Sequence, residues 1–326
     1  MKISIIVPVY NEEKLIKECL DALINQNYPK TRYEIVVVND GSTDDTFKVV
    51  KEKQKEAEEK GVEMKVVSLE KNQGRVVARE TGAKKSKYNN LLFVDSRAIA
   101  NENVLENIKK ISYQPIVGNA LINFNRSALD RFKFLLKRKL YPPFFGKSFE
   151  PLFITEDNFD RIAKGTGIFF CDKELFLSSQ LKDKSKYVSD DTKLLWKIVQ
   201  KKKILKHPNV KVISTVRIIL KDEIKHTFSR GIRFVDYYLN PKKKYFWLFI
   251  FFPIVTLIFT ITLIFINSTY FLYWLVFLIL IWIFVSVWLA ENIKDFFIVF
   301  GFLPIIALSF EIGILKGLIL KLLKRY

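Results

Sequence analysis

Cysteine is scarce in this sequence of 326 residues, which contains only Cys19 and Cys171. Two cysteines so far apart provide neither a disulfide framework nor the ligand spacing of a metal site, and they fit a reducing, cytosolic environment. No internal repeat is present, so a repeat architecture is excluded. The apolar run at residues 3–9 is short and is assigned to a strand, so we expect no signal peptide.

Acidic residues are also few, with 34 of them against 53 basic residues and a net charge of +19. Only five basic and three acidic residues follow Lys244, so nearly all of the excess lies before it. This excess favours an anionic partner: a membrane surface, a phosphorylated substrate or a nucleic acid. A lysine-rich solvated surface is the plain alternative. No stacking or recognition motif accompanies the charge, so we expect no nucleic-acid partner.

Charge is absent altogether from residues 245–266 and 270–290. Each segment is long enough to cross a bilayer, and tryptophan and tyrosine lie near the ends of both. We therefore predict a transmembrane hairpin, with core helices as the less favoured alternative. The basic residues 242–244 precede the first span and mark that side as cytoplasmic.

A third apolar stretch, residues 296–319, allows two interpretations. It is interrupted by Glu311 and Lys316. A third crossing would place the basic residues of the C-terminus outside, against the positive-inside tendency. A re-entrant segment followed by an interfacial amphipathic helix avoids that conflict and is slightly favoured.

The first 45 residues predict a strand, a helix and a second strand in order. Residues 3–9 and 33–38 are apolar except for Ser4 and Glu34, as parallel strands covered on both faces are. Asn11 is expected to cap the intervening helix, with Glu12 in its first turn. Asp40 follows the second strand, where open α/β sheets bind ligands.

These two strand ends, PVYNEE at 8–13 and VVVNDGSTDDT at 36–46, resemble the opening of the family 2 glycosyltransferases. The family consists of inverting enzymes with a GT-A fold, and the resemblance covers about residues 1–235. It implies an α/β domain with a Rossmann-like mixed sheet, followed by an all-α transmembrane region. The expected domains are a cytosolic GT-A domain at 1–235, a basic juxtamembrane linker at 236–244 and the membrane region at 245–326.

The resemblance also implies a nucleotide-sugar donor, with its base and ribose near four residues: Pro8, Tyr10, Glu12 and Asp40. Further matches in the segment 71–82 suggest diphosphate contacts for Lys71, Gly74 and Arg79. Gly74 can let the backbone approach a phosphate, and Arg79 can pair with its oxygens. A surface ion pair is the alternative for Arg79.

Asp95-Ser96-Arg97 stands where the family has Asp-x-Asp, two carboxylates that hold a divalent cation against the donor diphosphate. We assign all three residues to the donor site and Asp95 to Mg²⁺ or Mn²⁺. Because Arg97 replaces the second carboxylate, three outcomes stay open. Asp95 binds the metal with help from the diphosphate, Arg97 supplies the positive charge itself, or activity is lost.

The catalytic residues implied by the resemblance are Asp190 and Asp191. They follow a glycine-containing segment, residues 164–170, that resembles the one preceding the family's catalytic acid. Asp191 aligns with the base that removes the proton of the acceptor hydroxyl, and Asp190 would help to keep one of the pair available. A helix cap is the alternative. An acceptor that is a lipid phosphate is already ionised, and Asp191 would then orient it or bind metal.

Arg230 and Arg233 resemble a relaxed form of an Arg-x-x-Arg-Trp motif, with Phe234 in place of tryptophan. At positions i and i+3 they share one helical face and can bind a diphosphate or an acceptor phosphate. Anionic lipid head groups explain them equally well.

Together these features predict a multi-pass protein of the cell membrane with a cytoplasmic catalytic domain. It would transfer a sugar to a lipid-borne acceptor: polyprenyl or dolichyl phosphate, a lipid-linked oligosaccharide or a glycolipid. One alternative, motivated by Arg97, is a non-catalytic scaffold that binds nucleotide sugar. A processive polysaccharide synthase is less favoured, because the spans are few for a secretion channel.

Overall fold

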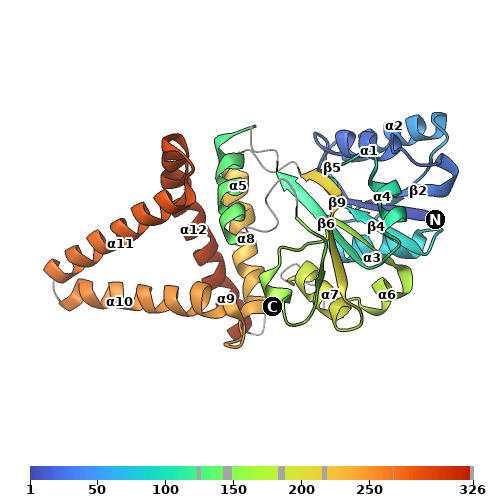
Figure 1. Ribbon diagram of the computed structural model, residues 1–326. Coiled ribbons are helices and arrows are strands. Elements are labelled where there is room, and N and C mark those ends of the chain that lie inside the picture. The colour runs from blue at the N-terminus through green and yellow to red at the C-terminus, as the bar shows by residue number, and fades with distance from the viewer. Residues whose placement is uncertain (123–125, 142–148, 183–187, 215–218, 267, 324–326) are drawn as a thin grey trace. The chain divides into compact units, whose positions relative to one another are not determined.

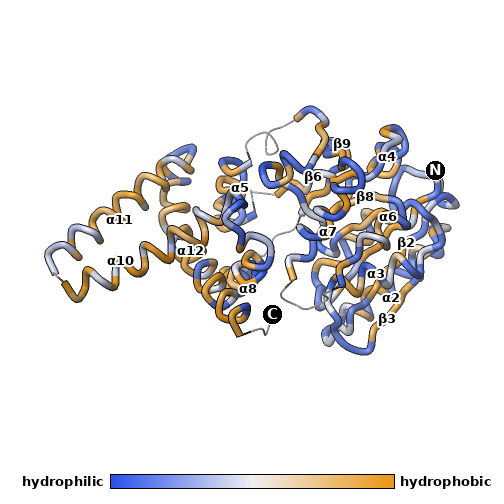
Figure 2. The backbone as a smooth tube through the Cα atoms, turned by 90° about the horizontal axis from the view of Figure 1, so that it is seen from below, coloured by the Kyte–Doolittle hydropathy of each residue, from blue (hydrophilic) through white to orange (hydrophobic). Residues whose placement is uncertain are grey.

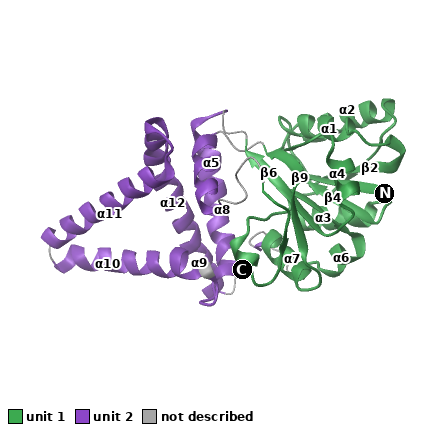
Figure 3. Cartoon of the chain, viewed as in Figure 1, with its two compact units in different colours: residues 1–123, 143–186, 190–216 green, residues 124–142, 187–189, 217–326 purple. Residues whose placement is uncertain are grey.

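The computed structural model describes residues 1–122, 126–141, 149–182, 188–214, 219–266 and 268–323. The chain forms two compact units, coloured separately in Figure 3. Unit 1 contains residues 1–123, 143–186 and 190–216, and unit 2 contains residues 124–142, 187–189 and 217–326. The domain boundaries expected from the sequence stay a prediction.

Unit 1 is built on a mixed sheet, which has nine strands among the described residues (Figure 1). Eight of them follow the order β3 (Glu63–Ser68), β2 (Tyr33–Asn39), β1 (Ile3–Val9), β4 (Asn90–Val94), β8 (Ile168–Asp172), β6 (Ile116–Ile122), β9 (Ile204–Ser214) and β5 (Ala98–Ala100). The ninth, β7 (Leu152–Ile154), pairs with β9. Strands β1 to β4 are parallel, whereas β8 is antiparallel to both of its neighbours. The expected α/β class with a mixed sheet is confirmed.

Helices cover both faces of the parallel part of the sheet. The helices of unit 1 are α1 (Ile16–Ile24), α2 (Thr46–Glu59), α3 (Arg75–Lys85), α4 (Val104–Ile111), α6 (Lys173–Ser178) and α7 (Asp190–Val199), with 3-10 turns at Lys30–Arg32 and Phe159–Arg161. Alternate residues of β2 face opposite sides: Val37 packs in the cluster that contains Leu20 of α1, and Val38 packs with Ala78 of α3. Burial on both faces explains why β1 and β2 are mostly apolar. The buried Ser4 and Glu34 are exceptions, and the Ser4 hydroxyl donates to the Glu34 carboxylate at 2.5 Å.

The first helix starts later than the sequence suggested. Asn11 has a φ of 51° and is no N-cap, and α1 begins only at Ile16. The backbone N–H groups of this segment bond to side chains of the next loop. The N–H of Asn11 donates to Ser42 Oγ, and the N–H of Glu12 donates to Thr46 Oγ1. The Asn11 side chain also accepts from the N–H of Thr43. The expected cap therefore joins two loops at the carboxyl ends of β1 and β2.

Unit 2 is helical. It contains α5 (Ala128–Leu140), α8 (Leu220–Tyr238), α9 (Lys244–Phe246), the π-helical turn η4 (Trp247–Phe251), α10 (Phe252–Ile266), α11 (Ser268–Leu289) and α12 (Ile293–Leu322). Among the described residues, three helical segments are apolar and long enough to cross a membrane: Trp247–Ile266, Ser268–Leu289 and Ile293–Leu322. Figure 2 shows the hydrophobic character of α10 and α11.

The first two segments match the predicted hairpin. The third is one continuous helix of 30 residues, so the break between a re-entrant segment and a separate amphipathic helix is absent. Glu311 and Lys316, which interrupt the apolar stretch, lie inside this helix rather than at a boundary. Helix α8 also continues past residue 235, where the catalytic domain was expected to end.

Gly41, which follows β2, lies close to the backbone of the loop at Lys71. It has a φ of +67°, and a Cβ there would lie 2.5 Å from the carbonyl carbon of Lys71. Gly41→Ala is expected to cost about 2–5 kcal/mol, combining left-handed strain with backbone overlap. Gly61→Ala is the matched control, because Gly61 has a φ of +72° but open space around a Cβ. It should cost only about 1–2 kcal/mol. Thermal unfolding of both variants in detergent measures the difference, and equal losses would contradict the close approach.

Candidate functional site

Asp40 holds the loop that precedes α3. Its buried carboxylate accepts hydrogen bonds from the N–H of Gln73 at 2.7 Å and of Gly74 at 2.9 Å. Burial raises the pKa of Asp40, and these two hydrogen bonds partly oppose that rise. Gly74 itself has a φ of +87°, which suits glycine at the entry to a helix. A contact of Asp40 or Gly74 with nucleotide stays a prediction.

Arg75 and Arg79 lie on one face of α3, four residues apart. The buried Arg79 guanidinium is 2.7 Å from Asp191 Oδ1, 3.5 Å from Asp190 Oδ2 and 3.2 Å from Asp95 Oδ1. Arg75 pairs closely with Asp190 and lies 3.8 Å from Asp191 Oδ2. Four residues expected from three separate motifs, Arg79, Asp95 and the pair Asp190 and Asp191, are thus brought together. Arg79 lies in a buried network rather than in a surface pair.

Two residues of this cluster had no role in the sequence analysis. One is Arg75, whose i, i+4 spacing from Arg79 was the available signal. The other is Thr166, whose hydroxyl donates to Asp191 Oδ1 at 2.6 Å. Thr166 lies in the glycine-containing segment, and the carbonyl of the adjacent Gly167 accepts from the N–H of Asp95 at 3.0 Å. This segment therefore links Asp95 to Asp191.

The two neighbouring carboxyl groups have opposite electrostatic environments. Burial raises the pKa of Asp190, and repulsion from Asp191 adds to the rise. Burial would also raise the pKa of Asp191, but the guanidinium groups of Arg75 and Arg79 and the Thr166 hydroxyl outweigh it and hold that pKa below its usual range. Asp191 is therefore the more acidic member of the pair.

Arg97 is engaged by an acid of this chain. Its guanidinium pairs with the Glu12 carboxylate, which the sequence had assigned to the nucleotide. The pair has no net charge, so Arg97 as it stands does not supply a free cation. Next to it, Ser96 is buried, with 8% of its surface exposed.

The remaining expected donor contacts lie around these loops. Pro8 is in β1, opposite Val38 of β2, and Tyr10 has an exposed ring at the end of that strand. Lys71 is exposed in the loop held by Asp40. No contact with donor is assigned to them by this geometry alone.

Asp95 fits the role of a single protein ligand to a metal. One oxygen, Oδ1, accepts from Arg79, and Oδ2 has no hydrogen-bond partner among the described residues. No group of three or more His, Cys, Asp or Glu residues within the described ranges could hold a metal ion. Mg²⁺ is commonly bound by one or two carboxylates together with substrate phosphates, and Asp95 suits that arrangement.

Arg230 and Arg233 belong to α8 in unit 2. Arg230 is exposed and forms a cationic group with Lys133 and Lys137 of α5. The pKa of Lys137 is lowered to about 8. Burial is the largest cause, and repulsion from Arg230 and Lys133 adds to it. Glu223 pairs with Lys133 at 2.7 Å and offsets part of this charge. The group suits an anionic partner.

A sequence profile described as "Glycosyl transferase family 2" matches residues 4–171. Among curated relatives, a poly(ribitol-phosphate) beta-glucosyltransferase of Bacillus spizizenii is 44% identical over 96 residues, covering 29% of this chain and 15% of that protein. A dolichyl N-acetyl-alpha-D-glucosaminyl phosphate 3-beta-D-2,3-diacetamido-2,3-dideoxy-beta-D-glucuronosyltransferase of Methanococcus voltae is 37% identical over 105 residues, covering 32% of each chain. The chain therefore matches a third or less of the length of these relatives.

The fold extends further than the sequence similarity. A mannosyltransferase from Pyrobaculum calidifontis, solved in complex with GDP-Man and Mn²⁺, aligns with 97% of this chain and 87% of its own, with a TM-score of 0.64 and 18% identity. The expected GT-A fold, with helices after it, is confirmed. The family profile covers less than the 1–235 over which the motifs suggested resemblance.

Arg79→Gln tests the network through stability. Removing one partner of a buried ion pair is expected to cost about 3–5 kcal/mol. The control is Arg75→Gln. Because the Arg75 side chain is 43% exposed, this variant should lose less stability than Arg79→Gln.

The variant Arg79→Gln also predicts a dependence on pH. Because the pKa of Asp191 is lowered in the folded protein, the pairing of Asp191 stabilises the fold above about pH 4, and this stabilisation is lost as pH falls through the folded pKa. The difference in melting temperature between wild type and Arg79→Gln should therefore narrow at acidic pH, and a pH-independent difference would contradict the assignment.

Proposed function

The chain belongs to glycosyl transferase family 2, and on that premise we propose that it is a membrane-bound inverting glycosyltransferase. It transfers a sugar from a nucleotide-diphosphate sugar to a lipid-borne acceptor. The observation that carries the proposal is the cluster in which Arg75 and Arg79 meet Asp95, Asp190 and Asp191. It combines cations that can receive a diphosphate with an ionised carboxylate that can receive a proton.

The arginines provide the donor contact. A guanidinium binds phosphate oxygens in the same forked geometry in which it binds a carboxylate, so a donor diphosphate competes with the aspartates for Arg75 and Arg79. Arg75 is the more accessible of the two, with 43% of its side chain exposed against 4% for Arg79. Arg75 is therefore expected to exchange partners, whereas Arg79 keeps Asp95 and Asp191 in place.

Asp191 is the proposed base. While both arginines face it, the low pKa makes it a weak proton acceptor. A diphosphate that draws Arg75 away raises that pKa, so Asp191 becomes a better base only when donor is present. Thr166 keeps one carboxylate oxygen in position during this exchange. If the acceptor is a phosphate, Asp191 orients the attacking oxygen instead.

A divalent metal completes the donor site in this proposal. Asp95 would hold Mg²⁺ or Mn²⁺ together with the donor diphosphate, and the ion would neutralise charge on the leaving nucleoside diphosphate. The Mn²⁺ named with the Pyrobaculum structure supports this choice. With one protein carboxylate available, metal is expected to bind weakly until donor arrives.

The acceptor is proposed to be lipid-borne because the chain carries segments that can span a membrane. The dolichyl N-acetyl-alpha-D-glucosaminyl phosphate in the name of the Methanococcus relative supports this, as do the grouped cations around Arg230. The basic residues 242–244 favour a cytoplasmic catalytic unit in the cell membrane. Arg233 remains a proposed contact of diphosphate or acceptor phosphate.

The alternative of a non-catalytic nucleotide-sugar scaffold rests on Arg97. Its pairing with Glu12 leaves the site without the second metal carboxylate. A scaffold would bind donor but would not turn it over, so activity separates the two functions.

Asp191→Asn is expected to lower transfer by about 10²–10⁴-fold while nucleotide binding is retained. Purified protein in lipid is supplied with UDP- and GDP-sugars and a polyprenyl phosphate, and radiolabelled product is measured. The matched control is Asp157→Asn, an exposed aspartate of the same unit, which should be unaffected. If no donor is turned over by wild type although nucleotide binds, the scaffold is correct. A polymeric product would instead favour a processive synthase.

EDTA is expected to abolish transfer, and added Mn²⁺ or Mg²⁺ should restore it. EDTA already saturated with Mn²⁺ controls for effects of the chelator itself. Asp95→Asn should raise the metal concentration needed for half-maximal activity. Full activity of wild type in EDTA would refute a metal at Asp95.

A further inference from the structure

The hairpin of α10 and α11 provides the reference for the position of α12. The two helices contact each other through Thr260 and Trp274, where the indole N–H donates to the hydroxyl at 2.9 Å, and through the rings of Phe259 and Trp274. The hairpin begins after the basic residues 242–244 and returns at Leu289. Its two open ends, near residues 247 and 289, therefore lie on the same side of a membrane that the hairpin crosses.

The N-terminal half of α12 packs at one of these open ends. Phe300 stacks on Trp282 of α11 with ring centroids 4.1 Å apart. Asp295 forms a two-oxygen ion pair with Arg131 of α5, at 2.7 and 2.9 Å. Val299 joins the cluster of Leu289 with the apolar face of α5. Helix α12 thus starts beside the returning end of the hairpin.

The C-terminal half of α12 packs at the other open end. Ile314 lies in a cluster with Ile250, at the start of the first span, and with Val235 of α8. Phe310 contacts the ring of Phe249 at 5.8 Å. A helix whose two halves touch the same-side ends of a hairpin runs across those ends, as α12 does within unit 2 in Figure 1.

Helix α8 gives a second, independent constraint. Ser309 donates to the carbonyl of Ile224 at 2.8 Å, and a Cβ on Gly313 would overlap the carbonyl of Phe228. One turn later, Gly317 faces Ile232 in the same way, so the two helices run parallel in close contact. Small residues at this spacing let helix backbones approach.

This contact is incompatible with a crossing by α12. Helix α8 exposes four charged residues along the same stretch: Lys221, Asp222, Lys225 and Arg230. A crossing would carry them into the hydrocarbon, where each costs at least about 2.5–3.5 kcal/mol. The length of α12 also disagrees with a crossing. Its 30 helical residues span about 45 Å, whereas the hydrocarbon core is about 30 Å thick.

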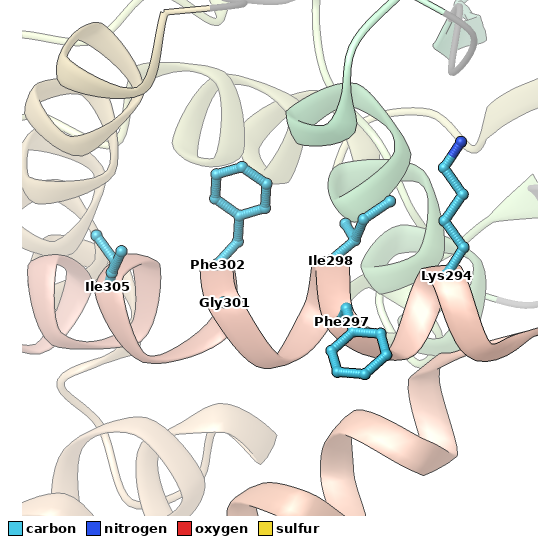
Figure 4. A pocket seen from close by; sticks show the side chains of 6 residues that line it. All are labelled: Lys294, Phe297, Ile298, Gly301, Phe302 and Ile305. Carbon is cyan, nitrogen blue, oxygen red and sulfur yellow. The ribbon is translucent and has the colours of Figure 1, made fainter.

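The outer face of α12 is suited to lipid. Its exposed residues recur every three or four positions and are apolar: Leu308, Ile312, Leu315, Ile319 and Leu322. Nearer the N-terminus, an apolar groove of about 480 Å³ continues along this helix, opened by Gly301 and with Lys294 at one end (Figure 4). Exposed Lys316 and Lys321 accompany the stripe. An apolar stripe accompanied by basic residues is typical of an interfacial helix.

We infer that α12 lies along the membrane–water interface on the side of residues 242–244, with its apolar stripe in contact with the lipids of that leaflet. The described part of the chain then crosses the membrane twice, and the end of α12 near Leu323 lies on the side on which the hairpin starts. This also resolves the conflict of a third crossing with the basic C-terminus. The inference rests on the membrane anchoring in the proposed function.

Three single cysteines in the full chain test this arrangement: Lys242→Cys, Ser268→Cys and Leu323→Cys. The native Cys19 and Cys171 are buried, so wild type gives the background. A membrane-impermeant maleimide is applied to sealed vesicles of either orientation. Positions 242 and 323 should be labelled from one side, and position 268 from the other.

The outcomes separate the inference from its premise. Labelling of 323 from the side of 268 would overturn the interfacial position of α12 and leave the proposed function intact. Labelling of 268 from the side of 242 would show that the hairpin does not cross, which overturns the membrane anchoring as well. Unequal labelling caused by misfolding is detected by the depth measurement that follows.

Spin labels at Phe297, Leu308 and Ile319 measure the depth of α12. They should lie at one depth within a few ångströms. A crossing helix would spread 297 and 319 by about 33 Å, at about 1.5 Å per residue. The control pair is Leu248 and Ile264 on the first span, each 54% exposed, which should differ by about 24 Å. A steady change of depth from 297 to 319 would overturn the inference.

Discussion

The buried guanidinium of Arg79 is the charge around which the candidate site is organised. An unpaired cation in that position would be strongly destabilising, so the fold must bring carboxylates to it. They come from two places, Asp95 after β4 and the aspartates at the start of α7. The order of the strands and the start of α7 are thereby linked to one side chain of α3. Gly167 and Thr166 close the arrangement by bonding to Asp95 and Asp191.

The same balance of charge explains how the site could respond to its substrate. In the structure the cations and carboxylates of the cluster pair with one another, and the two arginines hold the pKa of Asp191, the proposed base, below its usual range. In the proposed function, an incoming diphosphate would add negative charge beside the arginines and shift that balance. Arg97 lies outside this cluster and pairs with Glu12. The departure from Asp-x-Asp therefore changes the local pairing without removing the two arginines that face the carboxylates.

Unit 2 combines two kinds of apolar helix that look alike in composition. Helices α10 and α11 have few buried residues and contact each other as a hairpin. Helix α12 is as apolar over a long stretch, yet it carries Ser309, Gly313 and Gly317 on one face, which bring it against α8. Hydropathy measures how well a segment tolerates lipid, whereas packing against a charged helix decides where in the membrane it can lie.

The sequence by itself determined the features that depend on neighbouring residues. The apolar runs of β1 and β2, the uncharged spans and the types of residue at the strand ends are all local properties, and the structure has them close to the expected positions. It did not determine the start of α1, because the Asn11 side chain accepts a hydrogen bond from the N–H of Thr43 in the next loop and does not cap the helix. The pairing of Arg97 with Glu12, the shared aspartates of Arg75 and Arg79 and the position of α12 were decided only by tertiary structure. Their partners lie between about 80 and 160 residues away, so the order of the strands and the close approach of helices, rather than any local pattern, select them.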